Sequence, residues 1–113
     1  MIVELITRMF KIRNQAHMQH WLTESLAEHE ALDEYYKGVI KHLDGFVETY
    51  QGGFGRVENL PDQAKDVRQA IEDEMLWLAQ HREEIAKNVP ALENLLDELS
   101  DLHMHILYKL TLR

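Results

Sequence analysis

Residues 25–51 read SLAEHEALDEYYKGVIKHLDGFVETYQ, and this stretch predicts one long amphipathic helix. Its apolar side chains return every three or four positions, the spacing that places them on one helical face. These apolar positions are Leu32, Tyr35, Val39, Leu43, Phe46 and Tyr50. Ser25 followed by Glu28 matches a capping box at the start of the helix, and Gly52 is the expected C-cap.

The same helical spacing of apolar residues returns in three other segments, at about 3–22, 62–87 and 90–110. Pro61 is expected at or near the first turn of the third segment. No segment alternates apolar and polar residues over the length of a strand. Four amphipathic helices with short connections predict an all-α fold, an antiparallel four-helix bundle formed by a single domain over residues 1–113.

The composition limits the kinds of site and partner that the chain can have. No cysteine is present, so thiolate metal sites are excluded and His, Asp and Glu remain as ligands. The formal net charge of −8 argues against nucleic-acid binding, which needs clustered Lys and Arg. Charges interrupt the apolar run of residues 1–12, so we expect neither a signal peptide nor a membrane span. The expected location is the cytoplasm, that of a host cell if the gene is viral.

Four potential metal ligands lie on one face of the long predicted helix. His29 and Asp33 are four residues apart, so they occupy neighbouring turns. Asp44 and Glu48 have the same spacing. At about 1.5 Å of rise per residue, Asp33 and Asp44 lie roughly 16 Å apart along the axis, which one ion cannot bridge. If both pairs bind the same metal, the second pair comes from another, antiparallel copy of the helix. The predicted assembly is then a homodimer or higher homo-oligomer with symmetric interfacial sites.

Plainer interpretations of these residues remain open. The His/Asp pair is compatible with a local contact within the helix, and the Asp/Glu pair with a solvated acidic face, since the chain has 20 acidic residues. Glu30 and Glu34 are also four residues apart, but no second segment points to them. The chain contains no Glu-x-x-His, so the usual intrachain di-iron site of four-helix bundles is not expected.

A longer pattern of residues resembles a known family. The string HWLTESLAEHEALD at 20–33 is followed, ten residues later, by DGFVE at 44–48 and then by a Gly-Gly pair. This order is similar to that of the Dps family of mini-ferritins, over about residues 14–53. The stretch His-Trp-x-Thr-x-Ser-x-Ala-x-His resembles a small phage-encoded branch more closely. The resemblance implies a ferritin-like four-helix bundle.

The resemblance also implies a ferroxidase site at a dimer interface, with iron as the metal and manganese or zinc as alternatives. One subunit would supply His20, His29 and Asp33, and the other would supply Asp44 and Glu48. These five residues would be both the metal ligands and the catalytic residues. Oxygen or peroxide would oxidise bound Fe(II), and the hard carboxylate ligands would favour Fe(III).

The first histidine of the pattern has two candidates. His17 has the spacing to His29 that the Dps family shows, twelve residues, whereas His20 is nine residues away and has Trp21 beside it. Both stay open as metal ligands, and His20 is favoured. No Lys-rich tail precedes the first segment, so DNA binding through a basic tail is not expected.

Two functions from different classes follow from this sequence. The leading prediction is a Dps-like protein that binds iron at dimer-interface His/Asp/Glu sites, with ferroxidase and iron-detoxification activity. The alternative is a non-catalytic helical-bundle protein with an interaction or structural role, which contacts a phage or host protein and keeps its metal ligands as relics. A structural zinc dimer is a third reading, since zinc accepts the same ligands.

Overall fold

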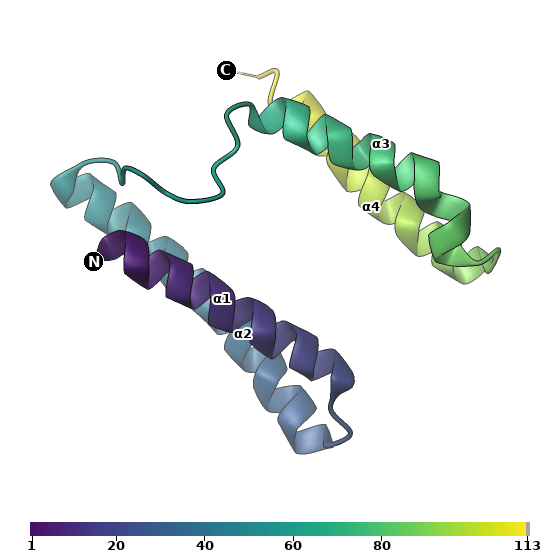
Figure 1. The fold of residues 1–113 in the computed structure, drawn as a ribbon, viewed down its shortest axis with the longest axis horizontal. Helices are drawn as coiled ribbons and strands as arrows, with labels where there is room; N and C mark the ends of the chain where they lie inside the picture. The colour runs from purple at the N-terminus through teal and green to yellow at the C-terminus, as the bar shows by residue number, and fades with distance from the viewer. Residues whose placement is uncertain (113) are drawn as a thin grey trace. The chain divides into compact units, whose positions relative to one another are not determined.

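The computed structural model describes residues 1–112, and these contain four α-helices and no strand, so the all-α prediction is confirmed (Figure 1). The helices are α1 (Ile2–Leu22), α2 (Leu26–Phe54), α3 (Val67–Ala86) and α4 (Pro90–Lys109). None of the helices in residues 1–112 combines the length and the apolar character that crossing a membrane requires.

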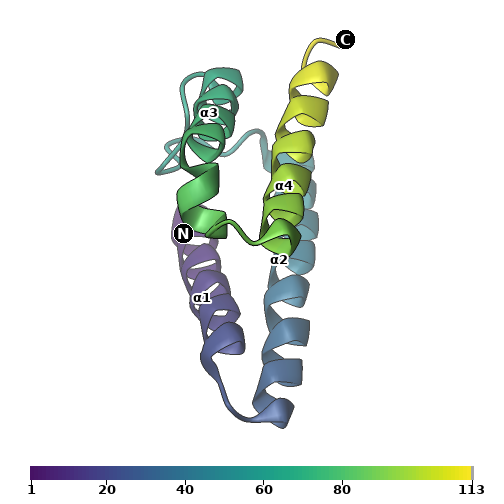
Figure 2. The ribbon, with the colours of Figure 1, turned by 90° about the vertical axis from the view of Figure 1, so that its right-hand side faces the viewer.

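The helices form two compact units, Met1–Asp62 and Gln63–Arg113. In the first unit α1 packs against α2, and in the second α3 packs against α4 (Figures 1 and 2). Each unit is an antiparallel helical hairpin, and two such hairpins are the components that an antiparallel four-helix bundle requires. The ferritin-like arrangement and the single domain stay predictions.

Both helices of the first hairpin contribute side chains to its core. The buried residues are Ile6, Ala16 and His20 of α1 and Tyr36 and Leu43 of α2. Leu43 belongs to the apolar stripe predicted for this helix, whereas Tyr35 and Phe46 of the same stripe are 44% and 51% exposed. A single partner helix covers only a narrow strip of α2, so the wider apolar face stays open within the hairpin.

A short connection joins α1 to α2 and is held by side-chain hydrogen bonds. The Ser25 hydroxyl accepts from the backbone N–H of Glu28 at 3.2 Å, so the predicted N-cap is confirmed. The second half of the predicted capping box is not formed, because the Ser25 N–H donates to the Thr23 hydroxyl at 3.2 Å. The Glu28 carboxylate instead accepts from the Gln19 side-chain amide at 3.1 Å, which ties α1 to α2.

The end of α2 lies beyond the predicted position. The helix continues to Phe54 instead of ending at Gln51, so the prediction of Gly52 as the C-cap is wrong. Gly52 and Gly53 remain helical, and the chain leaves the helix at Gly55, where φ is 89°. Glycine enters this region without the steric penalty of a side chain. The predicted carboxylate pair of this helix therefore lies well inside one continuous helix.

The start of α3 also differs from the prediction. The helix begins at Val67 and not at residue 62, and Pro61 lies outside it. Asp62 has a φ of 58°, which a right-handed helix cannot accommodate. The Asp66 carboxylate accepts from the backbone N–H of Gln69 at 3.1 Å, so Asp66 is the N-cap that defines where α3 starts.

An ion-pair network centred on Arg82 joins α3 to α4 in the second hairpin. The Arg82 guanidinium donates two hydrogen bonds to the Asp97 carboxylate, at 2.8 and 3.0 Å, and lies 3.2 Å from a Glu93 oxygen. This two-point geometry is the strongest that an arginine makes with a carboxylate. The Arg82 hydrogen bonds hold the pKa of Asp97 below its ordinary value. The network thus joins α3 to α4 through side chains at defined positions of both helices.

The apolar stripe of α4 is only partly covered by α3. Leu107 is buried, but five leucines of the helix or its end are between 44% and 57% exposed. These leucines are Leu92, Leu95, Leu99, Leu102 and Leu110. The hairpin therefore presents an apolar helix face that its own two helices do not bury.

The Arg82 network predicts a pH-dependent stability. Because the folded-state pKa of Asp97 is lowered, its ion pair stabilises the fold above the ordinary carboxyl pKa and stops doing so as the pH falls through the lowered value. We expect Asp97→Asn to lower the melting temperature at neutral pH, and the difference from the wild type to shrink below about pH 4. Circular dichroism melts over this range measure the effect. Asp101→Asn, at an exposed position of the same helix, is the control, and an Asp97→Asn difference that is constant with pH would contradict the prediction.

Candidate metal centre

Three of the predicted metal ligands border one open depression at the turn end of the first hairpin. His20 comes from the end of α1, and His29 and Asp33 come from the first turns of α2. Leu26 and Glu30 complete the lining of the depression. The short connection between α1 and α2 brings these side chains together. The sequence spacing placed two of them on one helix face, and the fold adds the third from the neighbouring helix.

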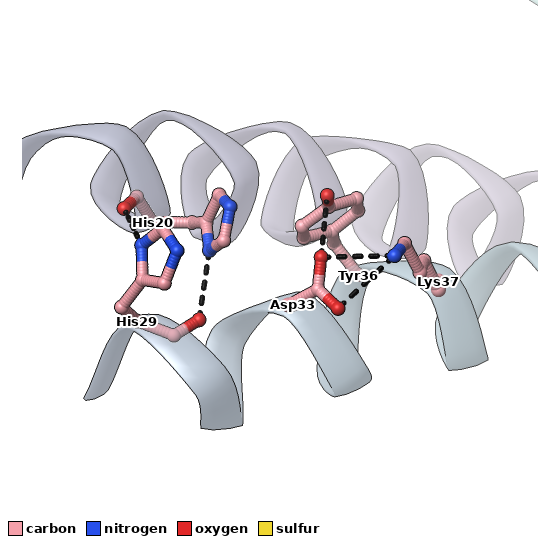
Figure 3. A network of polar contacts seen from close by, with 5 residues as sticks. All are labelled: His20, His29, Asp33, Tyr36 and Lys37. Carbon is pink, nitrogen blue, oxygen red and sulfur yellow. Dashed lines mark hydrogen bonds and ion pairs between the residues drawn. The ribbon is translucent and has the colours of Figure 1, made fainter. Parts of the chain in front are cut away.

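His20 and His29 hold each other through a reciprocal pair of hydrogen bonds (Figure 3). The Nδ1 of His20 lies 2.7 Å from the carbonyl oxygen of His29, and the Nδ1 of His29 lies 2.8 Å from the carbonyl oxygen of His20. The two rings stack with their centroids 3.7 Å apart and their planes inclined by 17°. His20 is 9% exposed, whereas His29 is on the surface.

These hydrogen bonds determine which ring nitrogen is free. A carbonyl oxygen can only accept, so both Nδ1 atoms carry a proton. In a neutral ring the lone pair then lies on Nε2. Histidines that bind metals are commonly held in this way, with the second ring nitrogen donating to a backbone carbonyl. Both histidines therefore hold the tautomer that Nε2 ligation requires, whereas their stacked rings do not direct the two Nε2 atoms at one ion.

The Asp33 carboxylate is engaged by two neighbours on α2 (Figure 3). The Tyr36 hydroxyl donates to Oδ1 at 2.9 Å, and Lys37 Nζ lies 3.0 Å from both carboxylate oxygens. The Lys37 hydrogen bond, followed by that of Tyr36, lowers the pKa of Asp33, and the same contact raises the pKa of Lys37. Burial and the Asp33 hydrogen bond raise the pKa of Tyr36. Asp33 is thus an ionised carboxylate whose orientation is held by two hydrogen bonds.

His17 lies in a different environment from His20. Its ring stacks on Tyr36 with centroids 3.8 Å apart and planes inclined by 10°, and its centroid lies 4.4 Å from that of Trp21. Burial, and then the nearby charge of Arg13, lower the pKa of His17. The structure places His20, and not His17, against His29. The pair that is nine residues apart in the sequence is therefore in contact, and the pair that is twelve residues apart is not.

Asp44 and Glu48 lie further along α2, on the exposed surface of the helix. Because α2 is continuous, the axial distance of roughly 16 Å between Asp33 and Asp44 holds. Within residues 1–112 no three His, Asp or Glu side chains are arranged to hold a metal ion. One chain therefore does not assemble a full ligand set in this structure, and completion by a second copy stays a prediction.

Three residues near the depression were not predicted as part of the site. The sequence does not predict Glu30 as a metal ligand, because no second segment supplies a partner for it. In the structure Glu30 borders the depression together with His20. Lys37 and Tyr36 bind Asp33 directly. The four-residue spacing from Asp33 to Lys37 is a known helix ion-pair signal and was available in the sequence.

The reciprocal histidine contact makes a spectroscopic prediction. We expect the His20 and His29 imidazoles to hold the proton on Nδ1 at neutral to alkaline pH, because each Nδ1 has a carbonyl acceptor. The ¹⁵N shifts of the imidazole nitrogens distinguish the two tautomers. His42, an exposed histidine of the same helix, is the internal reference. A neutral His20 or His29 ring with its proton on Nε2 and none on Nδ1 would show that the contact does not persist in solution.

Comparison with known proteins identifies a family for this chain. No curated protein and no solved structure matches the sequence. Residues 20–110 match a family described as "Family of unknown function (DUF5856)". The matched segment includes His20, His29, Asp33, Asp44 and Glu48, whereas His17 precedes it. Since the match covers most of the chain, the protein belongs to the DUF5856 family of unknown function.

Proposed function

We propose that this protein is a ferritin-like, Dps-like metal-binding protein that takes up iron between two copies of its chain. The observation that supports the proposal best is that two histidines with the proton on Nδ1 and an ionised aspartate line one open depression. Two imidazoles and a carboxylate form a common partial ligand set for non-haem iron. Asp44 and Glu48 of an antiparallel partner chain would complete the set with two further carboxylates.

Iron in this proposal is the substrate, and the protein supplies ligands and geometry. His20 and His29 would offer neutral nitrogen donors, and Asp33 an anionic oxygen donor. Carboxylate oxygens stabilise Fe(III) more than Fe(II), so the proposed ligand set favours the oxidised product. Oxygen or peroxide would be the electron acceptor. Mn(II) and Zn(II) are alternative ions for the same donors.

A second candidate function is favoured by a separate observation. Five leucines on α4 or at its end stay exposed in the second hairpin. An apolar face of this kind suits a helical interaction or structural protein that contacts a phage or host protein. In that case the ligands of the first hairpin would be relics, with Asp33 serving as the ion-pair partner of Lys37.

Native mass spectrometry after anaerobic Fe(II) loading and desalting tests the first function. We expect an even-numbered oligomer that carries bound iron, and we expect Asp44→Ala to lose the iron while its helical content is unchanged, because Asp44 is exposed on α2. Asp101→Ala, an exposed change on α4, should retain wild-type iron content. Wild-type iron content in Asp44→Ala would exclude that residue as a ligand.

A metal-dependent melting temperature gives an independent test. A ligand that binds only the folded protein stabilises it by about 2.7 kcal/mol at a concentration one hundred times its dissociation constant. We expect Fe(II), Mn(II) or Zn(II) to raise the melting temperature of the wild type and to leave that of Asp44→Ala unchanged. A protein with relic ligands would melt at the same temperature with and without each metal, which would favour the interaction function.

A further inference from the structure

Lys37 occupies the carboxylate that the proposed metal site needs. Its Nζ lies 3.0 Å from both oxygens of Asp33, while Oδ1 also accepts the Tyr36 hydroxyl at 2.9 Å (Figure 3). A carboxylate offers about four lone-pair positions in all, two on each oxygen. The two positions on Oδ1 are therefore filled, and one of those on Oδ2 is filled as well. A metal cannot bind both oxygens unless Lys37 leaves.

Electrostatic repulsion from Lys37 also opposes metal binding at Asp33. An ammonium group and a divalent cation that share one carboxylate repel each other. The pocket that receives the metal in the proposed function is lined by Asp33 together with His20 and His29. Metal entry at these residues therefore competes with the Lys37 ammonium.

Lys37 is able to leave the Asp33 carboxylate while α2 stays folded. Its side chain is 66% exposed, so the ammonium can turn into solvent. The Tyr36 hydroxyl, which belongs to a buried residue of α2, would stay on Oδ1 and keep the carboxylate oriented. The departure of Lys37 frees one position on each oxygen, so that a metal can then bind both.

We propose that Lys37 is a stand-in cation, which holds Asp33 in the metal-free chain and is displaced when a metal binds. This inference rests on the proposed metal-binding function and concerns the metal affinity of that same site. Every incoming ion must offset the loss of the Lys37–Asp33 pair. An ion that also gains from the Nε2 atoms of His20 and His29 can do so. Mg(II), which prefers oxygen ligands and gives up its water reluctantly, gains less and is held off.

Titration calorimetry of the metal-free protein with Zn(II), and separately with Mg(II), tests the proposal. Zn(II) is redox-inert and accepts imidazole ligands, so no oxidant complicates the measurement. We expect Lys37→Met to tighten the binding of each ion by about fivefold, the factor for one exposed ion pair near the upper end of its usual range. The metal-free melting temperature of the same variant should fall, because Asp33 loses its partner.

A purely structural lysine would lower the melting temperature without changing metal affinity, so the two readouts separate the two roles. Lys41→Met is the matched control, since Lys41 is exposed on the same helix and forms no ion pair within residues 1–112. Lys37→Gln removes the charge with a smaller change in polarity, and it replaces Lys37→Met if that variant does not fold. The gain in affinity should vanish in an Asp33→Asn background, because it acts through Asp33.

The outcomes distinguish this inference from the function on which it depends. If the wild type binds Zn(II) and Lys37→Met binds it equally well, the stand-in role is wrong while the metal site stands. If the gain persists in the Asp33→Asn background, it does not act through Asp33, and the inference is also wrong. If neither the wild type nor Lys37→Met binds Zn(II), the proposed function fails and the inference falls with it.

Discussion

The reciprocal hydrogen bonds between His20 and His29 are the constraint on which the candidate site depends. Each ring donates a hydrogen bond to the backbone carbonyl of the other residue. These two bonds join the last turn of α1 to the first turn of α2. Ring nitrogens that would otherwise be interchangeable become distinct. The connection that closes the hairpin therefore also determines the chemistry that the depression presents.

Much of the fold follows from local patterns that sequence alone displays. The apolar period identified four helices, and Ser25 marked the start of α2 through a real hydrogen bond. The two wrong helix ends share one cause. Gly52, Gly53 and Gly55 are alike as residue types, and only the three-dimensional path shows that Gly55 alone takes the positive φ. Asp62 and Asp66 are likewise the same residue type, and only the structure shows that Asp66 is the residue that caps α3.

The part of the candidate site that lies within one helix could be predicted from the sequence. The contacts between two helices could not. Helix geometry alone places His29 and Asp33 on neighbouring turns. Spacing cannot decide between His17 and His20, because that choice depends on how the end of α1 meets α2 in space. The structure separates them, with His20 against His29 and His17 stacked on Tyr36. A carboxylate in a sequence also does not reveal whether its oxygens are already occupied, as those of Asp33 are.

The ion pair within α2 bears on the order in which the proposed assembly forms. A chain with a formal net charge of −8 resists pairing with its own copy, most of all where acidic faces meet. Lys37 cancels the charge of Asp33 on the face proposed to receive the partner, which would lower the repulsion between two metal-free chains. Iron would then enter a dimer that already exists. On this order of events, the amount of assembled protein follows protein concentration and not the supply of iron.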